Sequence, residues 1–157
     1  MTQRFSLVRA GATALLIGAG TAALLSASSR VQAADLTVDV KNVHSAAGKV
    51  MVALHANVDG VKFPGDAGTV AAQWRKAEAG TMRFVFAGLQ PGRYAVAVFH
   101  DENDNAVLDS NLLGIPSEGY GFSQDAKGFA GPPAFDAAAV ELSATAEAVT
   151  TSAALGY

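Results

Sequence analysis

The sequence has no cysteine among its 157 residues. This absence excludes disulfide bonds, thiolate metal sites, iron–sulfur clusters, a thiol nucleophile and a lipidated N-terminal cysteine. Positive charge is also scarce, because 11 Lys and Arg residues stand against 14 Asp and Glu and give a formal net charge of −3. A nucleic-acid-binding domain calls for a clustered basic surface, so the charge balance excludes nucleic acid as a partner. The length suits one domain and is short for two.

The first 33 residues have the order of a secretory signal peptide. Arg4 and Arg9 form a basic start, residues 10–25 are uncharged and mostly apolar, and a polar stretch ends in Val-Gln-Ala at 31–33. This order predicts cleavage after Ala33. The alternative is an uncleaved anchor, which calls for about 20 apolar residues, whereas this run has 16 and includes three glycines. Because there is no Arg-Arg pair, we expect the Sec route.

Cleavage would leave a single domain, residues 34–157, in the periplasm or outside the cell. It removes three basic residues and no acidic one, so the remaining 124 residues carry a net charge of −6. A domain of this size buries enough apolar surface to fold without disulfides, which suits a cysteine-free protein in an oxidising compartment. We expect no transmembrane span after cleavage.

From residue 34 onwards apolar and polar residues alternate, which is typical of half-buried strands. Residues 36–40 and 50–54 alternate on either side of a turn and predict a hairpin. Between Thr69 and Ala79 the apolar residues fall instead at helical spacing, and a short helix is predicted there.

Four further strands follow the same alternating pattern. They are expected at 82–86, at 94–98, at Ala137–Ser143 and at Ala148–Leu155. Six or seven short strands separated by turns predict an all-β fold, an antiparallel Greek-key β-sandwich of the Ig-like or prealbumin-like kind.

A tight turn precedes the strand at 94–98. Pro91 and Gly92 form the turn, and Tyr94 follows two residues later. This spacing resembles the tyrosine corner of Greek-key sandwiches, in which the hydroxyl bonds to upstream backbone and fixes a crossover. We therefore predict a structural role for these three residues.

The segment 101–135 has little periodicity and is the densest in polar residues. A connection of this length inside a compact domain is usually functional or disordered. Four side chains fall at positions one, three, five and nine of an EF-hand-type calcium loop: Asp101, Asn103, Asn105 and Asp109. The segment differs from an EF-hand loop at two positions: Ala106 replaces the turn glycine, and Leu112 replaces the bidentate glutamate.

Two interpretations of this loop stay open. The first is a calcium-stiffened sandwich loop, with Glu118 as a more distant carboxylate and Ca²⁺ as the sole cofactor. The second is an Asx-rich turn, in which Asp and Asn side chains bond to their own backbone.

Other side chains of the segment are candidates for ligand or partner contact. His100 ends a strand beside the acidic loop, where it is either a structural residue at the rim or a general base or metal ligand, and the structural role is favoured. His44 and His55 lie on other strands at no ligand spacing, so a zinc site is not predicted. Tyr120 and Phe122 form either a ligand platform or a small core of the loop itself.

The residue types of a hydrolase triad are also present, because His100 and the loop carboxylates could combine with either Ser117 or Ser123. The sequence has no G-x-S-x-G elbow or other local signature of such an enzyme.

Taken together, these segments resemble a family of secreted bacterial proteins, DUF2141. Residues 86–105 read FAGLQPGRYAVAVFHDENDN, and the resemblance continues through Gly114-Ile-Pro116, EGYGFS at 118–123 and GPPAF at 131–135. The family loop usually carries Asn-Gly where this chain has Asn105-Ala106. The resemblance implies a secreted or periplasmic β-sandwich and supplies no catalytic or ligand residue. Residues 86–94 are also similar to prealbumin-like and carboxypeptidase-regulatory-like modules, which are generally non-catalytic.

The sequence thus predicts a non-enzymatic periplasmic or secreted β-sandwich. We expect it to bind an envelope protein or a small ligand through the loop at 101–135, because polar and aromatic residues gather there beside a regular scaffold. The alternative is a small periplasmic hydrolase that uses His100 and the loop carboxylates.

Overall fold

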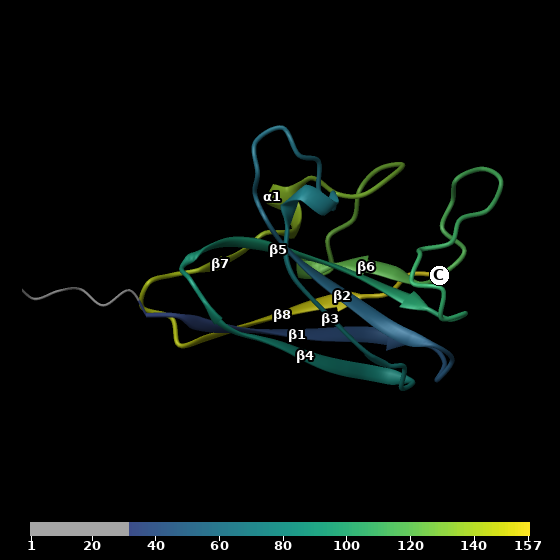
Figure 1. Ribbon diagram of the computed structural model, residues 1–157, viewed down its shortest axis with the longest axis horizontal. Helices are drawn as coiled ribbons and strands as arrows, with labels where there is room; N and C mark the ends of the chain where they lie inside the picture. Colours follow the sequence, from purple (N-terminus) through teal and green to yellow (C-terminus); the bar gives the residue numbers. More distant parts are fainter. Residues whose placement is uncertain (1–31) are drawn as a thin grey trace, which may run out of the picture.

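The computed structural model describes residues 32–157, so the predicted signal peptide lies outside the described residues apart from its last two positions. Eight strands dominate this part of the chain (Figure 1). They are β1 (Ala34–Val43), β2 (Lys49–Ala56), β3 (Thr69–Lys76), β4 (Gly80–Leu89), β5 (Gly92–Asp101), β6 (Tyr120–Phe122), β7 (Val140–Leu142) and β8 (Ala148–Ala154). The short helix α1 spans Phe135–Ala138, and two 3-10 turns span Asp66–Gly68 and Ser123–Asp125. No helix in these residues is long and apolar enough to span a bilayer.

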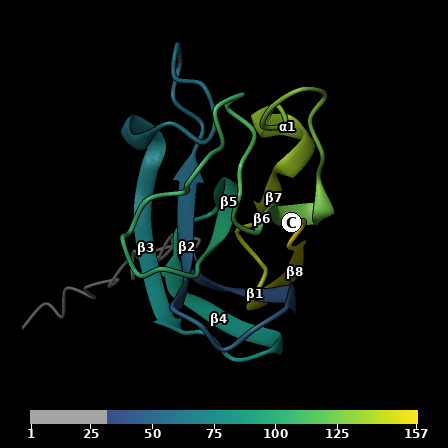
Figure 2. The ribbon, with the colours of Figure 1, turned by 90° about the vertical axis from the view of Figure 1, so that its right-hand side faces the viewer.

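The strands form two sheets that pack face to face. One sheet has the order β4-β1-β8, and the other has the order β3-β2-β5-β6 with β7 paired to β5 (Figure 2). Alternate residues of both sheets meet between them, including Leu36, Phe84, Leu54 and Val96, none of which is more than 2% exposed. Burying a side chain of this size stabilises the fold by about 2 kcal/mol, so the alternation read from the sequence is what holds the sheets together.

The predicted all-β sandwich is confirmed. It has eight strands in the described residues rather than about seven, and one pair departs from the antiparallel rule, because β1 and β8 run parallel.

The hairpin predicted from 36–40 and 50–54 was wrong. Both segments are strands, but β1 pairs with β4 and β8, whereas β2 pairs with β3 and β5 in the other sheet. The residues between them therefore connect the two sheets. Alternation shows which face of a strand is buried, and two strands that bury their faces in one core from opposite sheets show the same pattern.

The helix predicted between Thr69 and Ala79 was also wrong, because Thr69–Lys76 is strand β3. Two of the side chains that suggested a helix face, Val70 and Trp74, are 53% and 64% exposed. The backbone of β3 pairs with β2 from Lys76 to Thr69. Pairing with a neighbouring strand thus outweighs the local preference of this segment.

The strand predicted at Ala137–Ser143 is shorter than expected. Helix α1 occupies its start, and β7 covers only Val140–Leu142. The buried hydroxyl of Ser123 donates to the carbonyl of Ala138 and accepts the N–H of Val96, which ties the end of α1 to β5.

The turn after β4 carries the chain from one sheet to the other. Gly92 begins β5, and the Tyr94 hydroxyl donates a hydrogen bond to the Gln90 carbonyl at 3.0 Å. This is the contact that a tyrosine corner makes. Pro91 and Gly92 lie within the bridged turn, so the contact ties the crossover to the start of β5.

Candidate functional site

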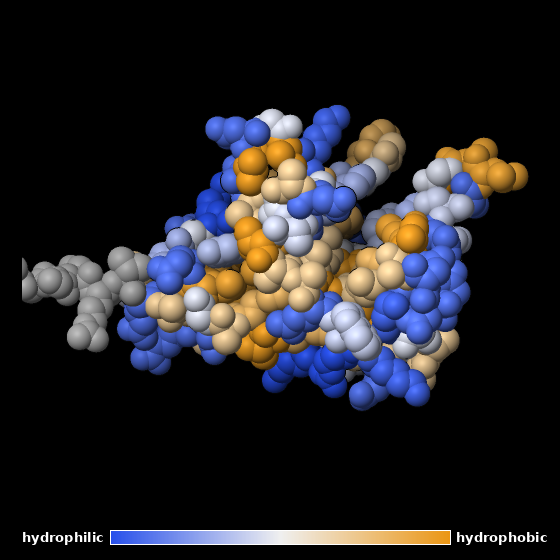
Figure 3. All heavy atoms as spheres, viewed as in Figure 1, coloured by the Kyte–Doolittle hydropathy of each residue, from blue (hydrophilic) through white to orange (hydrophobic). Residues whose placement is uncertain are grey.

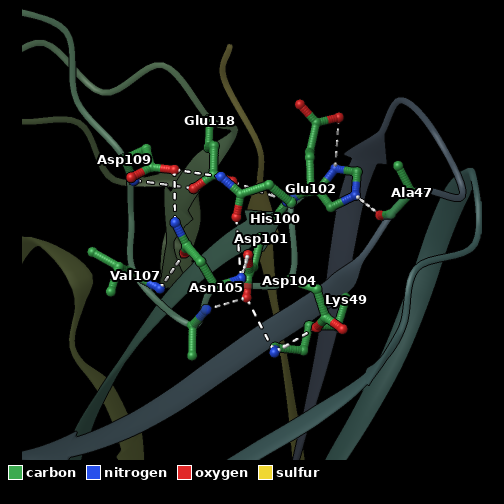
Figure 4. Close-up of polar contacts among 12 residues, drawn as sticks. Ala47, Lys49, His100, Asp101, Glu102, Asp104, Asn105, Val107, Asp109 and Glu118 are labelled. Atoms are coloured by element: carbon green, nitrogen blue, oxygen red, sulfur yellow. Dashed lines mark hydrogen bonds and ion pairs between the residues drawn. The ribbon is translucent and has the colours of Figure 1, made fainter.

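The buried carboxylate of Asp101 organises the start of the long loop (Figure 4). It is the last residue of β5, and its oxygens accept the backbone N–H groups of Asn105 at 3.0 Å and Ala106 at 2.7 Å. The Lys49 ammonium lies 3.2 Å from Oδ2 and also pairs with Asp104. Burial alone would raise the pKa of Asp101, but these three partners lower it below its ordinary value.

The remaining Asx side chains close the loop on itself. The side-chain amides of Asn103 and Asn105 donate to Oδ2 of Asp109 at 2.5 and 2.9 Å. The side-chain oxygen Oδ1 of Asn105 accepts the backbone N–H of Val107 at 2.8 Å. Ala106 has φ of 63°, a left-handed conformation that costs a residue other than glycine about 1 kcal/mol. The bond from its N–H to Asp101 stabilises the loop in this conformation.

Glu118 holds the two ends of the loop together. Its side chain is 5% exposed, and its carboxylate accepts the N–H of Glu102 at 2.9 Å and that of Asp109 at 3.0 Å. Figure 4 shows Glu118 beside Asp109. The residues 102–109 therefore form a closed, internally bonded unit at the end of β5.

The four residues of the predicted calcium loop are thus brought into one cluster. Their side-chain oxygens accept hydrogen bonds from backbone and amide groups of the loop, and Lys49 already provides a positive charge beside Asp101. The calcium site stays a prediction, and its test is a melting curve of the purified protein in millimolar Ca²⁺ and in EDTA. A rise in the melting temperature with Ca²⁺ that Asp109→Ala removes would support it, and identical curves would reject it.

The outer face of the five-stranded sheet carries a hollow whose floor is made of small residues. Ala53 on β2 pairs with Ala72 on β3 and with Ala97 on β5. The next rank of the same face carries large side chains, because Met51 pairs with Phe99, which in turn pairs with Tyr120. A row of alanines beside a row of large residues leaves a pocket of about 850 Å³.

Two loops form walls of this pocket, beside the connection between β2 and β3. Leu108, Leu113 and Ile115 contribute from the loop after β5, and residues 130–132 contribute from the loop before α1. Figure 2 shows the first loop, in green, passing over β2 and β3. Hydrophobic residues gather at its projecting tip (Figure 3), where Leu112 and Leu113 are fully or mostly exposed.

The predicted ligand residues have different surroundings. Tyr120 is half-buried and lines the pocket, while Phe122 also lines it but packs with Phe63 and Phe135 in a small second core. His100 is fully buried: its Nε2 lies 2.8 Å from the Ala47 carbonyl and its Nδ1 lies 2.8 Å from the Tyr157 hydroxyl. Glu118 belongs to the loop network.

Sequence reasoning missed one cluster. His44 was set aside because it shows no ligand spacing, yet its Nε2 lies 2.6 Å from Glu102 Oε1, and its ring is 5.7 Å from that of His100. The two histidines are 56 residues apart in the chain, so no local motif could reveal them. His55 lies elsewhere on β2, against Thr69 and Phe63.

A scan against known protein families matches residues 38–150 to a family described as an uncharacterized protein conserved in bacteria, DUF2141. This range runs from β1 into β8 and covers well over half of the chain. The chain belongs to the DUF2141 family. Comparison with curated proteins and with solved structures found no match.

The DUF2141 match contains the acidic loop, the alanine floor of the pocket and both connections that form its walls. The pocket and the loop are therefore parts of the family domain itself. The similarity to prealbumin-like and carboxypeptidase-regulatory-like modules stays a resemblance.

Proposed function

We propose that this DUF2141 protein is an exported, non-enzymatic binding module that holds one small, mostly apolar molecule over its five-stranded sheet. The observation that carries the proposal is the pocket of about 850 Å³. Sites for small ligands are typically concave, about 300–1,000 Å³ in volume, and lined mainly by apolar side chains. Export is supported by the signal-peptide pattern at 1–33.

A small molecule suits this surface better than a flat protein partner. The floor is recessed because Ala53, Ala72 and Ala97 lie side by side, and the walls are loops that project beyond the sheet. Exposed apolar residues at a loop tip beside such a hollow are costly in water and usually mark a binding surface. Leu113 and Ile115 are 83% and 57% exposed and would lose part of this exposure against a bound ligand.

Polar side chains in the lining of the pocket indicate that the ligand also carries a hydrogen-bonding group. His55 lines the pocket together with Asp66, Thr69 and Gln73. Burial lowers the pKa of His55, so the ring stays neutral and can donate or accept. The ligand that we propose is therefore a mostly apolar molecule that also carries a hydrogen-bonding group.

The hydrolase alternative has less support. A general base must reach the proton that it removes, and the His100 ring is fully buried with both nitrogens engaged by Ala47 and Tyr157. The loop carboxylates of Asp101 and Glu118 are likewise occupied by backbone N–H groups.

Binding of the uncharged fluorescent probe N-phenyl-1-naphthylamine tests the proposal. We expect saturable binding with one probe per chain and at least tenfold weaker binding by Ala53→Phe, because the new ring would fill the alanine floor. The matched control is Ala87→Phe, which places the same ring on an exposed position of β4 outside the pocket.

The melting temperatures of both variants would show whether they are folded. Saturable binding that survives in Ala87→Phe and is lost in Ala53→Phe supports the pocket. The proposal fails if the folded protein binds no probe, or if Ala53→Phe binds it as well as the parent protein.

A further inference from the structure

A second site lies beside the acidic loop and away from the alanine floor. His44 follows β1, His100 is on β5, and Glu102 directly follows β5. The donor atoms of these three side chains all lie within 4.8 Å of one another. We propose that His44, His100 and Glu102 bind one divalent transition-metal ion of the Zn²⁺ class.

The distances suit such an ion. Glu102 Oε1 lies 2.6 Å from Nε2 of His44 and 3.7 Å from Nδ1 of His100. Zinc bonds to nitrogen and oxygen are about 2.0–2.1 Å long, and tetrahedral geometry then places neighbouring donors about 3.3 Å apart. The observed separations bracket this value, so small rotations of exposed side chains would bring the three donors to the ion.

The surroundings of His100 orient its ring as those of a metal ligand do. A carbonyl can only accept a hydrogen bond, so the 2.8 Å contact with Ala47 assigns the proton to Nε2 (Figure 4). In the neutral ring, Nδ1 then carries the lone pair, which accepts the Tyr157 hydroxyl at 2.8 Å and lies 3.7 Å from Glu102 Oε1. A bound ion would replace the Tyr157 hydroxyl at this nitrogen. Ligating histidines almost always donate their second nitrogen to a carbonyl or carboxylate, which fixes the ring and its tautomer.

His44 and Glu102 provide the access route. Their side chains are 50% and 28% exposed, whereas His100 has no exposed surface. Tyr157 stacks on His44 with ring centres 3.7 Å apart and thereby orients its imidazole towards Glu102. An ion can thus enter from solvent and meet two ligands before it reaches the buried third.

The donor types determine the class of ion. Two imidazoles with one carboxylate suit zinc, copper and related ions, whereas Ca²⁺ prefers oxygen ligands alone. This set is therefore distinct from the predicted calcium loop, even though Glu102 lies between Asp101 and Asn103. The three ligands leave a fourth position open.

Calorimetric titration of the EDTA-treated, desalted protein with ZnCl₂ tests the site. We expect one Zn²⁺ per chain and at least a tenfold rise in Kd for His44→Gln and for Glu102→Gln. Both positions are partly exposed, so the variants should fold, which their melting temperatures would show. Millimolar Ca²⁺ should leave the Zn²⁺ affinity unchanged.

Two controls distinguish this site from adventitious binding and from the calcium loop. Glu78→Gln removes an exposed carboxylate far from the cluster in sequence, with a side chain 73% exposed, and Asp109→Asn removes a loop carboxylate. Both should keep the Zn²⁺ affinity of the parent protein. Absent binding, or binding that His44→Gln leaves intact, would overturn the proposal, and neither result would alter the outcome of the probe experiment on the pocket.

Discussion

Replacing Asp101 by asparagine should lower the free energy of unfolding by about 3 kcal/mol at pH 7. The buried carboxylate accepts two backbone N–H groups and the Lys49 ammonium, and an asparagine amide would place N–H groups against at least one of these donors. For a domain of this size the melting temperature should fall by about 10 °C. Urea unfolding followed by circular dichroism measures the difference.

Asp104→Asn is the matched control for Asp101→Asn. Asp104 pairs with the same Lys49 at 2.6 Å, but its side chain is 68% exposed. Exposed ion pairs contribute about 0–1 kcal/mol, so this variant should lose little stability. If the two variants lost equal stability, the Lys49 pair rather than the backbone bonds would account for the effect of Asp101.

The pH dependence of the Asp101→Asn effect has a definite sign. Because the folded pKa of Asp101 lies below its ordinary value of 3.8, ionised Asp101 stabilises the fold at all pH values above that value. This contribution disappears as the pH falls below 3.8 and through the folded pKa. The difference between parent and Asp101→Asn should therefore be constant between pH 7 and 5 and narrow at pH 3 and below, and a constant difference down to pH 2 would contradict the assignment.

Local patterns predicted local structure well. Alternation located most of the strands, and the spacing of Pro91 and Tyr94 predicted the bond from the tyrosine hydroxyl to upstream backbone. The density of Asp and Asn located the loop that closes on Asp101. In each case the residues that cause the structure lie within a few positions of one another.

Features that depend on strand partners escaped prediction. The pocket floor consists of Ala53, Ala72 and Ala97, which are unremarkable in sequence and meet only through the register of three strands. The pair His44 and Glu102 meets because the connection from β1 to β2 lies against the end of β5. Neither the sheet to which a strand belongs nor its register follows from alternation alone, which is also why the hairpin from 36–40 to 50–54 was wrong.

The junction between that connection and β5 should tolerate no side chain at Gly48. A Cβ built on Gly48 would lie 1.8 Å from the carbonyl oxygen of Asp101, and Gly48 has φ of 60°. Backbone cannot move aside as a side chain can, so Gly48→Ala must separate the start of β2 from the end of β5. We expect a loss of about 4 kcal/mol in the free energy of unfolding.

Gly60→Ala separates the two causes of the Gly48→Ala effect. Gly60 has φ of 76° and nothing within 4 Å of a built Cβ, so alanine there bears the conformational cost alone, about 1 kcal/mol. Faster amide exchange at Ala77, whose N–H donates to the Gly48 carbonyl, would locate the damage in Gly48→Ala. Equal losses for the two variants would mean that β2 and β5 do not approach closely at Gly48.

Because Ala47 accepts the bond that orients His100, a shift at Gly48 should also weaken Zn²⁺ binding in the folded fraction.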